Sequence, residues 1–387
     1  MWNRYTVRAT ASAFALMMAM ALTTTGVSFF VTPVCEFLQV GRGSVSLVYS
    51  LIVLTGALAA SLEGKFIQRH GVRLLMTAAA VWTAACFGLF ALSQELWMFY
   101  AVALLMGPFA HGCVMFCATV IVQRCFTGKQ AAGVTGIVMA GSGVGGALTS
   151  LVVPLVMDAL GWRAGYLSAA ALWLVLVVAA LLLLPRSFDA AEVKADAPAD
   201  QTGMTYREAL RSPQLYLLMA SMFLLTGANT VQQHLPAIAT DMGSTAAQVS
   251  AMLSAVTILL ALGKVAQGWL YGKIGVVKGG WVTMGCFAVS LLLIMWNGNT
   301  LPLVAIGMGV ATTLMPVAGR QIFGTKEYAA IWGLVSAAHH ASGCVMTPVW
   351  GVVYDAAGSY TPALIGFAAV CIAAQLLLIA AMKKVRV

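Results

Sequence analysis

Charged residues are scarce in this sequence. Asp, Glu, Lys and Arg make up 9% of the 387 residues, while 61% are hydrophobic and the mean hydropathy is +0.92. A soluble domain has about 25% charged residues, because its surface faces water. The shortage excludes a soluble enzyme with one large core and indicates a protein that crosses a membrane many times.

The sequence also lacks the motifs of common catalytic and metal sites. Its 8 cysteines are scattered and contain no zinc-type pair of pairs. Gly141, Gly143 and Gly146 match the spacing of a dinucleotide-binding fingerprint, but they lie inside an apolar run with no preceding strand. The sequence contains no catalytic triad or phosphate-binding loop. We therefore expect no enzyme activity, no cofactor and no metal.

Twelve apolar stretches are long enough to cross a bilayer as helices, each of which needs about 20 residues. They are too long for the strands of a membrane barrel, which have about 10 residues. The sequence therefore predicts an all-α membrane protein with twelve transmembrane helices. The stretches are residues 9–34, 45–62, 74–92, 96–122, 131–157, 164–184, 214–235, 247–270, 279–296, 301–317, 328–354 and 363–382.

One long polar segment divides these stretches into two halves that repeat each other. The predicted domains are an N-terminal half (1–185), a cytoplasmic central loop (186–211) and a C-terminal half (212–387). The repeated positions include Gly136 with Gly333, Asp158 with Asp355 and Gly161 with Gly358, and in a second register Gly64 with Gly268 and Gly71 with Gly275. Duplicated six-span halves are typical of secondary transporters, whose substrate site lies between the halves near the bilayer midplane.

Basic residues are distributed unevenly between the predicted loops. Of the 21 Lys and Arg residues, 18 fall on the side of the termini, Arg42 and Arg163 fall on the other side, and Lys264 lies within a span. Cytoplasmic loops carry such an excess, so both termini are predicted to lie in the cytoplasm of a cell with the chain in its inner membrane. Contact with anionic lipid explains the net charge of +9 without nucleic acid.

A loop motif after the second stretch connects the chain to a known family. Gly64, Gln68, Arg69, Gly71 and Arg73 resemble the Gly-x-x-x-Asp-Arg-x-Gly-x-Arg/Lys motif of the major facilitator superfamily, with Gln68 in place of the Asp. This resemblance implies two pseudo-symmetric six-helix halves.

The same resemblance implies a gating role for these five loop residues. A second copy contains Gly268 and Gly275, which share the expected role, and has Gly272 in place of the Asp. Restoring the missing carboxylate through Gln68→Asp is expected to favour the state closed to the cytoplasm.

Three segments resemble bacterial monocarboxylate porters, and the oxalate:formate antiporter group is a second match. The segments are residues 161–166, 206–213 and 234–243. In the similar porters a Gly-Arg-x-x-x-Gly pattern supplies an Arg for the substrate carboxylate, which implies this role for Lys264 between Gly263 and Gly268. The alternative for Lys264 is that its long stem carries the ammonium to the cytoplasmic face.

Polar residues in other spans are further candidates for the substrate site. In the antiporter group a Lys-x-x-x-Gly pattern falls on His339, while the adjacent His340 points about 100° away on the same helix. Both could instead form a hydrogen-bonded pair between helices. His234 is a pocket donor or a residue of the outer mouth. The remaining substrate-binding candidates are Asn229, Gln233 and Tyr49.

Acidic residues set an expectation about mechanism. All 12 are assigned to loops or span ends, with Glu63 nearest to the membrane core. A relay of buried carboxylates would then be missing, which favours anion exchange or facilitated movement. If protons are coupled, a histidine or the carboxyl of the substrate must carry them.

Three functions fit these observations. The first is alternating-access transport of a small organic anion, in first place a monocarboxylate, by a monomer that also uses a proton or a counter-anion. The second is efflux of amphiphilic or drug-like compounds, against which Lys264 argues for cations. The third is a non-transporting membrane sensor on the same fold.

Overall fold

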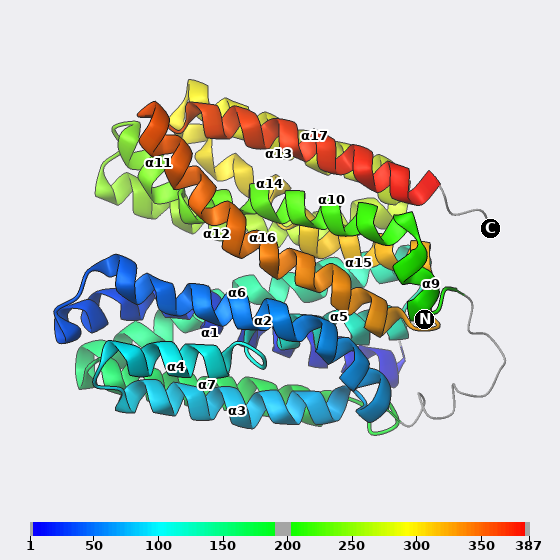
Figure 1. Ribbon diagram of the computed structural model, residues 1–387, viewed down its shortest axis with the longest axis horizontal. Coiled ribbons are helices and arrows are strands. Elements are labelled where there is room, and N and C mark those ends of the chain that lie inside the picture. Colours follow the sequence, from blue (N-terminus) through cyan, green and yellow to red (C-terminus); the bar gives the residue numbers. More distant parts are fainter. Residues whose placement is uncertain (1–2, 190–202, 384–387) are drawn as a thin grey trace. The chain divides into compact units, whose positions relative to one another are not determined.

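The computed structural model describes residues 3–189 and 203–383 (Figure 1). In this part of the chain the backbone is helical, and the β-type pairing is an isolated bridge between Gly203 and Gly324. Nine described helices are long and apolar enough to cross a membrane, and a bent helix adds a tenth. The prediction of an all-α membrane protein is confirmed.

Two compact units make up the chain. The first contains Met1–Cys125 and Gly141–Gln201, and the second contains Phe126–Ala140 and Thr202–Val387. The sequence predicted a single boundary, in the central loop. It did not predict that Phe126–Ala140 would group with the second unit. Residues 190–202 of that predicted loop lie outside the described residues.

The first unit is built from seven helices, of which the sixth is shared with the second unit. They are α1 (Arg4–Leu38), α2 (Arg42–His70), α3 (Val72–Leu92), α4 (Leu96–Met106), α5 (His111–Cys125), the later part of α6 (Gly128–Leu160) and α7 (Trp162–Leu183). The predicted fourth span is thus two helices, α4 and α5. The Gly107-Pro108 pair lies at this break, and proline removes a backbone donor and clashes with the preceding turn.

The second unit contains the start of α6 and the helices after the central loop. These are α9 (Tyr206–Arg211), α10 (Pro213–Asn229), η1 (Thr230–Gln233), α11 (Leu235–Asp241), α12 (Ala246–Ile274), α13 (Val276–Trp296), η2 (Gly298–Leu303), α14 (Val304–Gly307), α15 (Val310–Phe323), α16 (Tyr328–Ala357) and α17 (Thr361–Lys383). The predicted seventh and tenth spans are again broken, at η1 and at Gly309. Side-chain caps at Thr205 and Thr245 begin α9 and α12.

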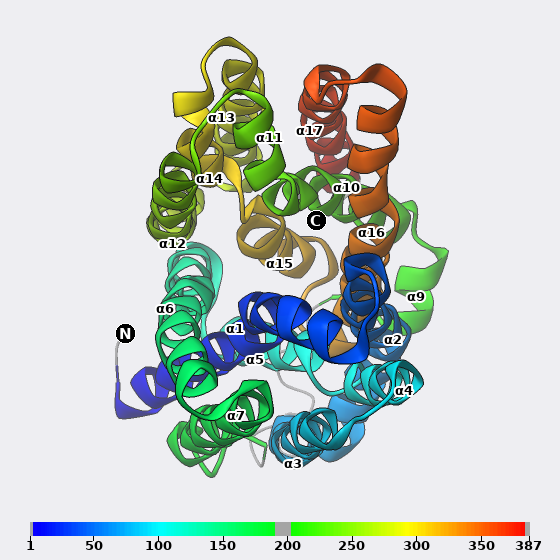
Figure 2. The ribbon, with the colours of Figure 1, turned by 90° about the vertical axis from the view of Figure 1, so that its left-hand side faces the viewer.

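The internal repeat of the sequence is present in the backbone. In the first unit α7 packs against α3 and α1, and in the second unit α17 packs against α13 and α10, which are the corresponding helices (Figure 2). Gly71 between α2 and α3 has φ 83° and ψ 166°, and Gly275 between α12 and α13 has φ 84° and ψ 166°. Glycine adopts this positive φ without a steric penalty. The two loop motifs therefore make the same turn.

Candidate functional site

Lys264 lies inside the second unit, and its side chain is 8% exposed. Its Nζ donates a hydrogen bond to the carbonyl oxygen of Met139 on α6, at 3.3 Å. The ammonium is held against the start of α6 in this structure. This geometry favours a buried cation over a lysine that extends to the cytoplasmic face.

Small residues let the helices approach closely around Lys264. At Gly136 on α6 an added Cβ would collide with the Lys264 carbonyl oxygen, and at Gly268 on α12 it would lie 2.5 Å from the Ala132 carbonyl oxygen. Side chains there would force α6 and α12 apart. Gly268, a predicted gating residue, thus also brings the Lys264 turn against α6.

The break between α14 and α15 provides space for the stem of Lys264. Gly309 has a φ of 86°, and a Cβ there would lie 3.0 Å from both Cγ and Cε of Lys264. Gln267 donates from Nε2 to the carbonyl oxygens of Ile306 at 2.7 Å and Met308 at 3.1 Å, and it accepts from Thr313 Oγ1 at 2.7 Å. Because a helix break frees backbone carbonyls that lipid cannot satisfy, Gln267 stabilises the break beside Lys264.

His339 and His340 lie on α16, where α16 packs against α10. The Nδ1 atom of His339 is 2.8 Å from Oγ1 of Thr226 on α10. The two imidazole rings lie 5.2 Å apart with an interplanar angle of 74°, and His340 is 2% exposed. The rings therefore point in different directions, as their adjacent positions on a helix require.

His234 is held against α16 by aromatic packing. Its Nε2 atom lies 3.2 Å from the carbonyl oxygen of Thr347, and its ring stacks on Trp350 at 5.9 Å. Trp350 in turn donates to Thr230 Oγ1 at 3.0 Å. These contacts fix the position of the His234 ring beside α16.

The other predicted substrate residues are more dispersed. Asn229 ends α10 with a buried Oδ1 that has no hydrogen-bond partner among the described residues. Gln233 is exposed, and Tyr49 is half-buried on α2 of the first unit. The sequence did not single out Thr226, and hydroxyl residues in apolar spans are too common to provide a signal.

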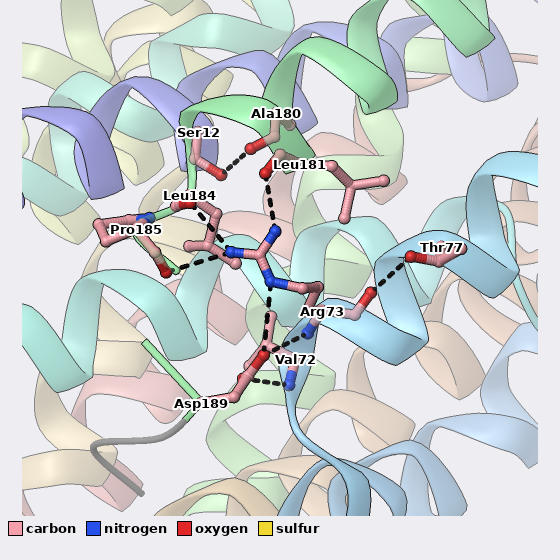
Figure 3. Close-up of polar contacts among 9 residues, drawn as sticks. All are labelled: Ser12, Val72, Arg73, Thr77, Ala180, Leu181, Leu184, Pro185 and Asp189. Atoms are coloured by element: carbon pink, nitrogen blue, oxygen red, sulfur yellow. Dashed lines mark hydrogen bonds and ion pairs between the residues drawn. The ribbon is translucent and has the colours of Figure 1, made fainter. Parts of the chain in front are cut away.

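At the predicted gating loop, polar side chains from three parts of the first unit form a cluster of contacts, which we term the loop clamp (Arg8, Ser12, Arg73 and Asp189). The Asp189 carboxylate accepts hydrogen bonds from the backbone N–H groups of Val72 at 2.9 Å and Arg73 at 3.3 Å, at the start of α3 (Figure 3). It also lies 3.9 Å from Nε of Arg73. An anion at a helix N-terminus is stabilised by the orphan N–H groups and the helix dipole.

The basic side chains of the loop clamp meet the opposite helix end. Arg73 donates to the carbonyl oxygens of Leu181, Leu184 and Pro185 at 3.0–3.1 Å, at the C-terminal end of α7 (Figure 3). Arg8 donates to Leu182 and Leu183, and Ser12 donates to Ala180. The last carbonyls of α7, which lack partners within the helix, are thereby satisfied.

The loop clamp places the carboxylate where the sequence did not predict it. Gln68 and Arg69 are exposed, and Gly64 is buried in α2. Among the motif residues it is Arg73 that donates to the end of a helix. The carboxylate comes from Asp189, 116 residues beyond Arg73 in the chain. No local spacing could have indicated this pairing.

The structure corrects the assignment of the acidic residues. Glu63 lies within α2, which continues to His70, and its side chain is 5% exposed. The expectation that every acid lies in a loop or at a span end is therefore wrong for Glu63. The hydropathy pattern placed the end of the span at residue 62, whereas burial depends on the helices packed around it.

Comparisons with known proteins agree with this architecture. The sequence profile described as Major Facilitator Superfamily matches residues 11–345. The chain belongs to the major facilitator superfamily. This is a family of membrane transporters and not of enzymes, and the long apolar helices described here fit a multi-pass membrane protein.

Distant relatives of this chain are found among known sequences. Rat monocarboxylate transporter 13 is 25% identical over 238 residues, which cover 59% of this chain and 55% of the relative. The chain thus spans about half the length of that curated relative.

Solved structures of the superfamily resemble the chain over its whole length. The crystal structure of the transporter FucP in its outward conformation has a TM-score of 0.73 at 14% identity, covering 98% of this chain and 99% of that one. The human organic anion transporter MFSD10 has a TM-score of 0.72 at 15% identity, with 97% and 99% covered. At these identities the likeness shows the fold alone.

Proposed function

We propose that this transporter moves a small organic anion, in first place a monocarboxylate, across the inner membrane by alternating access. The observation that carries the proposal is the buried Lys264, whose stem rests on Gly309 and whose ammonium lies at the Met139 carbonyl. A cation within a membrane span is costly, about 2.5–3.5 kcal/mol on insertion scales, and usually marks a substrate path.

The names of two similar proteins support an anionic substrate. A curated relative is named a monocarboxylate transporter and a structural neighbour an organic anion transporter. In this proposal Lys264 attracts the carboxylate. His339, His340, His234, Asn229, Gln233 and Tyr49 supply further polar contacts.

We further propose that the loop motifs control opening to the cytoplasm. The turn at Gly71 holds the N-terminus of α3 against Asp189, and Gly275 makes the same turn in the second unit. In this proposal Gly64, Gln68, Arg69, Arg73 and Gly268 act with these turns. Both termini and these loops face the cytoplasm.

A counterflow screen in proteoliposomes tests the substrate. Vesicles loaded with lactate, pyruvate, formate or oxalate should take up the labelled form of the same anion, and tetraphenylphosphonium should not be exchanged. Exchange of the hydrophobic cation but no carboxylate would replace the proposal with drug-like efflux. A protein that exchanges none of these probes, although folded, would favour the non-transporting sensor.

A further inference from the structure

The first unit contains a buried carboxyl group at a bend in a helix. α2 bends by 53° between Leu47–Ala60 and Leu62–His70, and Glu63 lies one turn or less beyond the bend. Glu63 is 5% exposed, and neither of its carboxyl oxygens has a hydrogen-bond partner among the residues the structure describes. An ionised carboxylate in such a place is costly, because it has lost water without gaining a donor.

The groups around Glu63 do not compensate a negative charge. α2 packs against α1, α3, α4 and α5. On α5 the Cys113 thiol is within electrostatic range of Glu63 and hydrogen-bonds with Cys117. A thiol carries no positive charge and is a weak donor.

Several basic and phenolic groups of those helices have contacts elsewhere. Arg8 of α1 and Arg73 of α3 donate to the end of α7, the Arg124 guanidinium of α5 lies over the Phe188 ring, and Tyr100 of α4 donates to the Ser44 carbonyl. No ion pair with Glu63 is found in the described part of the chain. No described side chain therefore supplies a hydrogen bond or an opposite charge to the Glu63 carboxyl. A bound proton would remove the charge without such a partner.

We propose that Glu63 is the proton-binding site of this transporter. The carboxyl holds a proton while it is buried beside α5, and it releases the proton when movement at the α2 bend opens it to water. The bound proton adds one O–H bond to one carboxyl oxygen, and release returns the carboxylate and the proton to solvent. This inference rests on the proposed anion transport and adds the coupled ion to it.

A proton fits this site better than a metal cation. Sodium and divalent ions require several oxygen ligands, and no group of three or more potential metal-ligating side chains is found among the described residues. A single carboxyl outside any such group suits a proton better than a metal ion. The proton at Glu63 and the anion at Lys264 would then be separate ligands, one in each unit.

Infrared spectroscopy of the purified protein tests the bound proton directly. Near neutral pH the wild-type protein should show the C=O band of a protonated carboxyl, and Glu63→Gln should remove it. Glu36→Gln and Glu95→Gln are matched controls, because both residues are exposed in the same unit, and each should keep the band. A band that persists in Glu63→Gln, or is missing from the wild type, would overturn the proposal.

Transport driven by a pH gradient tests coupling, with lactate as the probe. With one proton per anion, an outside pH one unit lower should concentrate lactate about tenfold, since one pH unit corresponds to about 1.36 kcal/mol. Glu63→Gln should exchange lactate at equal pH on both sides but lose this accumulation, and Glu95→Gln should retain it. Tenfold accumulation by Glu63→Gln would contradict the proposal.

The two experiments separate failure of this inference from failure of the proposed function. If the wild-type protein exchanges no carboxylate, anion transport is wrong, and the infrared band still decides whether Glu63 holds a proton. If exchange and accumulation are normal in Glu63→Gln, anion transport stands and Glu63 is not the coupling group.

Discussion

At the scale of single residues, a buried carboxyl group and a buried amino group distinguish this protein from a plain bundle of apolar helices. Among the described residues, Glu63 is 5% exposed in the first unit and Lys264 is 8% exposed in the second. Burying a charge is expensive. We therefore expect substitutions at Glu63 and Lys264 to change function more than folding.

Lys264→Ala should abolish saturable uptake of the anion while leaving expression and folding near the wild-type level. The substitution removes the attracting charge and also its desolvation cost. Lys264→Arg should retain part of the uptake with altered selectivity, because a planar guanidinium binds a carboxylate differently from a compact ammonium. Uptake of labelled lactate against concentration measures both.

Lys273→Ala is the control for Lys264, because Lys273 lies on the same helix with its ammonium 4.8 Å from the Trp269 ring centre and its side chain exposed. It should leave uptake unchanged. Full anion transport by Lys264→Ala would return Lys264 to a structural role.

His339→Ala should weaken transport less than Lys264→Ala, with the largest loss at acidic pH. An unperturbed imidazole gains its proton near pH 6.5, about where the added positive charge would assist an anion. Uptake measured from about pH 5.5 to 8 should show the wild-type and variant curves converge as the pH rises. A loss that is constant with pH would indicate that the contact with Thr226 matters and the charge does not.

At the scale of elements, the most constrained backbone positions lie at helix breaks and helix ends. The turn at Gly71 and the break at Gly309 both have a positive φ. Asp189 binds the backbone next to Gly71, and the Lys264 stem lies against Gly309. These are the positions where side-chain size and backbone conformation limit the sequence most strongly.

Gly309→Ala should destabilise the second unit and reduce anion uptake. Alanine pays about 1–2 kcal/mol in a left-handed conformation, and its Cβ would press on the Lys264 stem at 3.0 Å. Thermal stability in detergent and lactate uptake measure the two effects.

Gly285→Ala on α13 is the matched control, since a Cβ there meets no atom within 4 Å. It should keep or slightly raise stability, because alanine favours a helix over glycine by about 1 kcal/mol. Equal thermal stability and equal lactate uptake in the two variants would show that the positive φ and the Lys264 contact do not restrict residue 309 to glycine.

Arg73→Ala should lower thermal stability through the loop clamp. Hydrogen bonds to charged groups contribute about 1.5–3 kcal/mol when buried, and the effect is smaller here because the Arg73 and Asp189 side chains are 35% and 25% exposed. Asp189→Asn should cost less, since its amide oxygen still accepts from the start of α3. The unfolding temperature in detergent reports both.

Arg69→Ala is the control for the loop clamp, because Arg69 is exposed in the last turn of α2, close to Arg73 in the sequence. It should leave the unfolding temperature unchanged. The double variant Arg73→Ala with Asp189→Asn should lose less than the sum of the single losses if the two side chains act together.

At the scale of the whole molecule, the protein is a duplicated helical structure. Corresponding helices pack in the same pairs within each unit, and Gly71 and Gly275 have the same backbone angles. The orientation of this structure in the membrane remains a prediction from the distribution of Lys and Arg.

Cysteine labelling tests that orientation. In a chain whose native cysteines have been replaced, Gln68→Cys should react with an impermeant thiol reagent only from the cytoplasm, and Glu95→Cys only from outside. Both positions are exposed, so access depends on the side of the membrane. Labelling of Gln68→Cys in intact cells would reverse the orientation and the gating proposal with it.

Several features followed from the sequence by itself. The all-α membrane class, the duplication and the family were predicted, because hydropathy over about 20 residues and a short loop motif are local properties of the sequence. Lys264 was recognisable for the same reason, since a cation inside an apolar run needs no partner to be noticed.

Only the tertiary structure decided which side chains meet. The burial of Glu63 and the pairings of Arg73 with Asp189 and of His339 with Thr226 join residues on different helices. Such contacts depend on which helix faces pack together and where a helix bends. A hydropathy pattern records how apolar a segment is, but it does not record its rotation about its own axis.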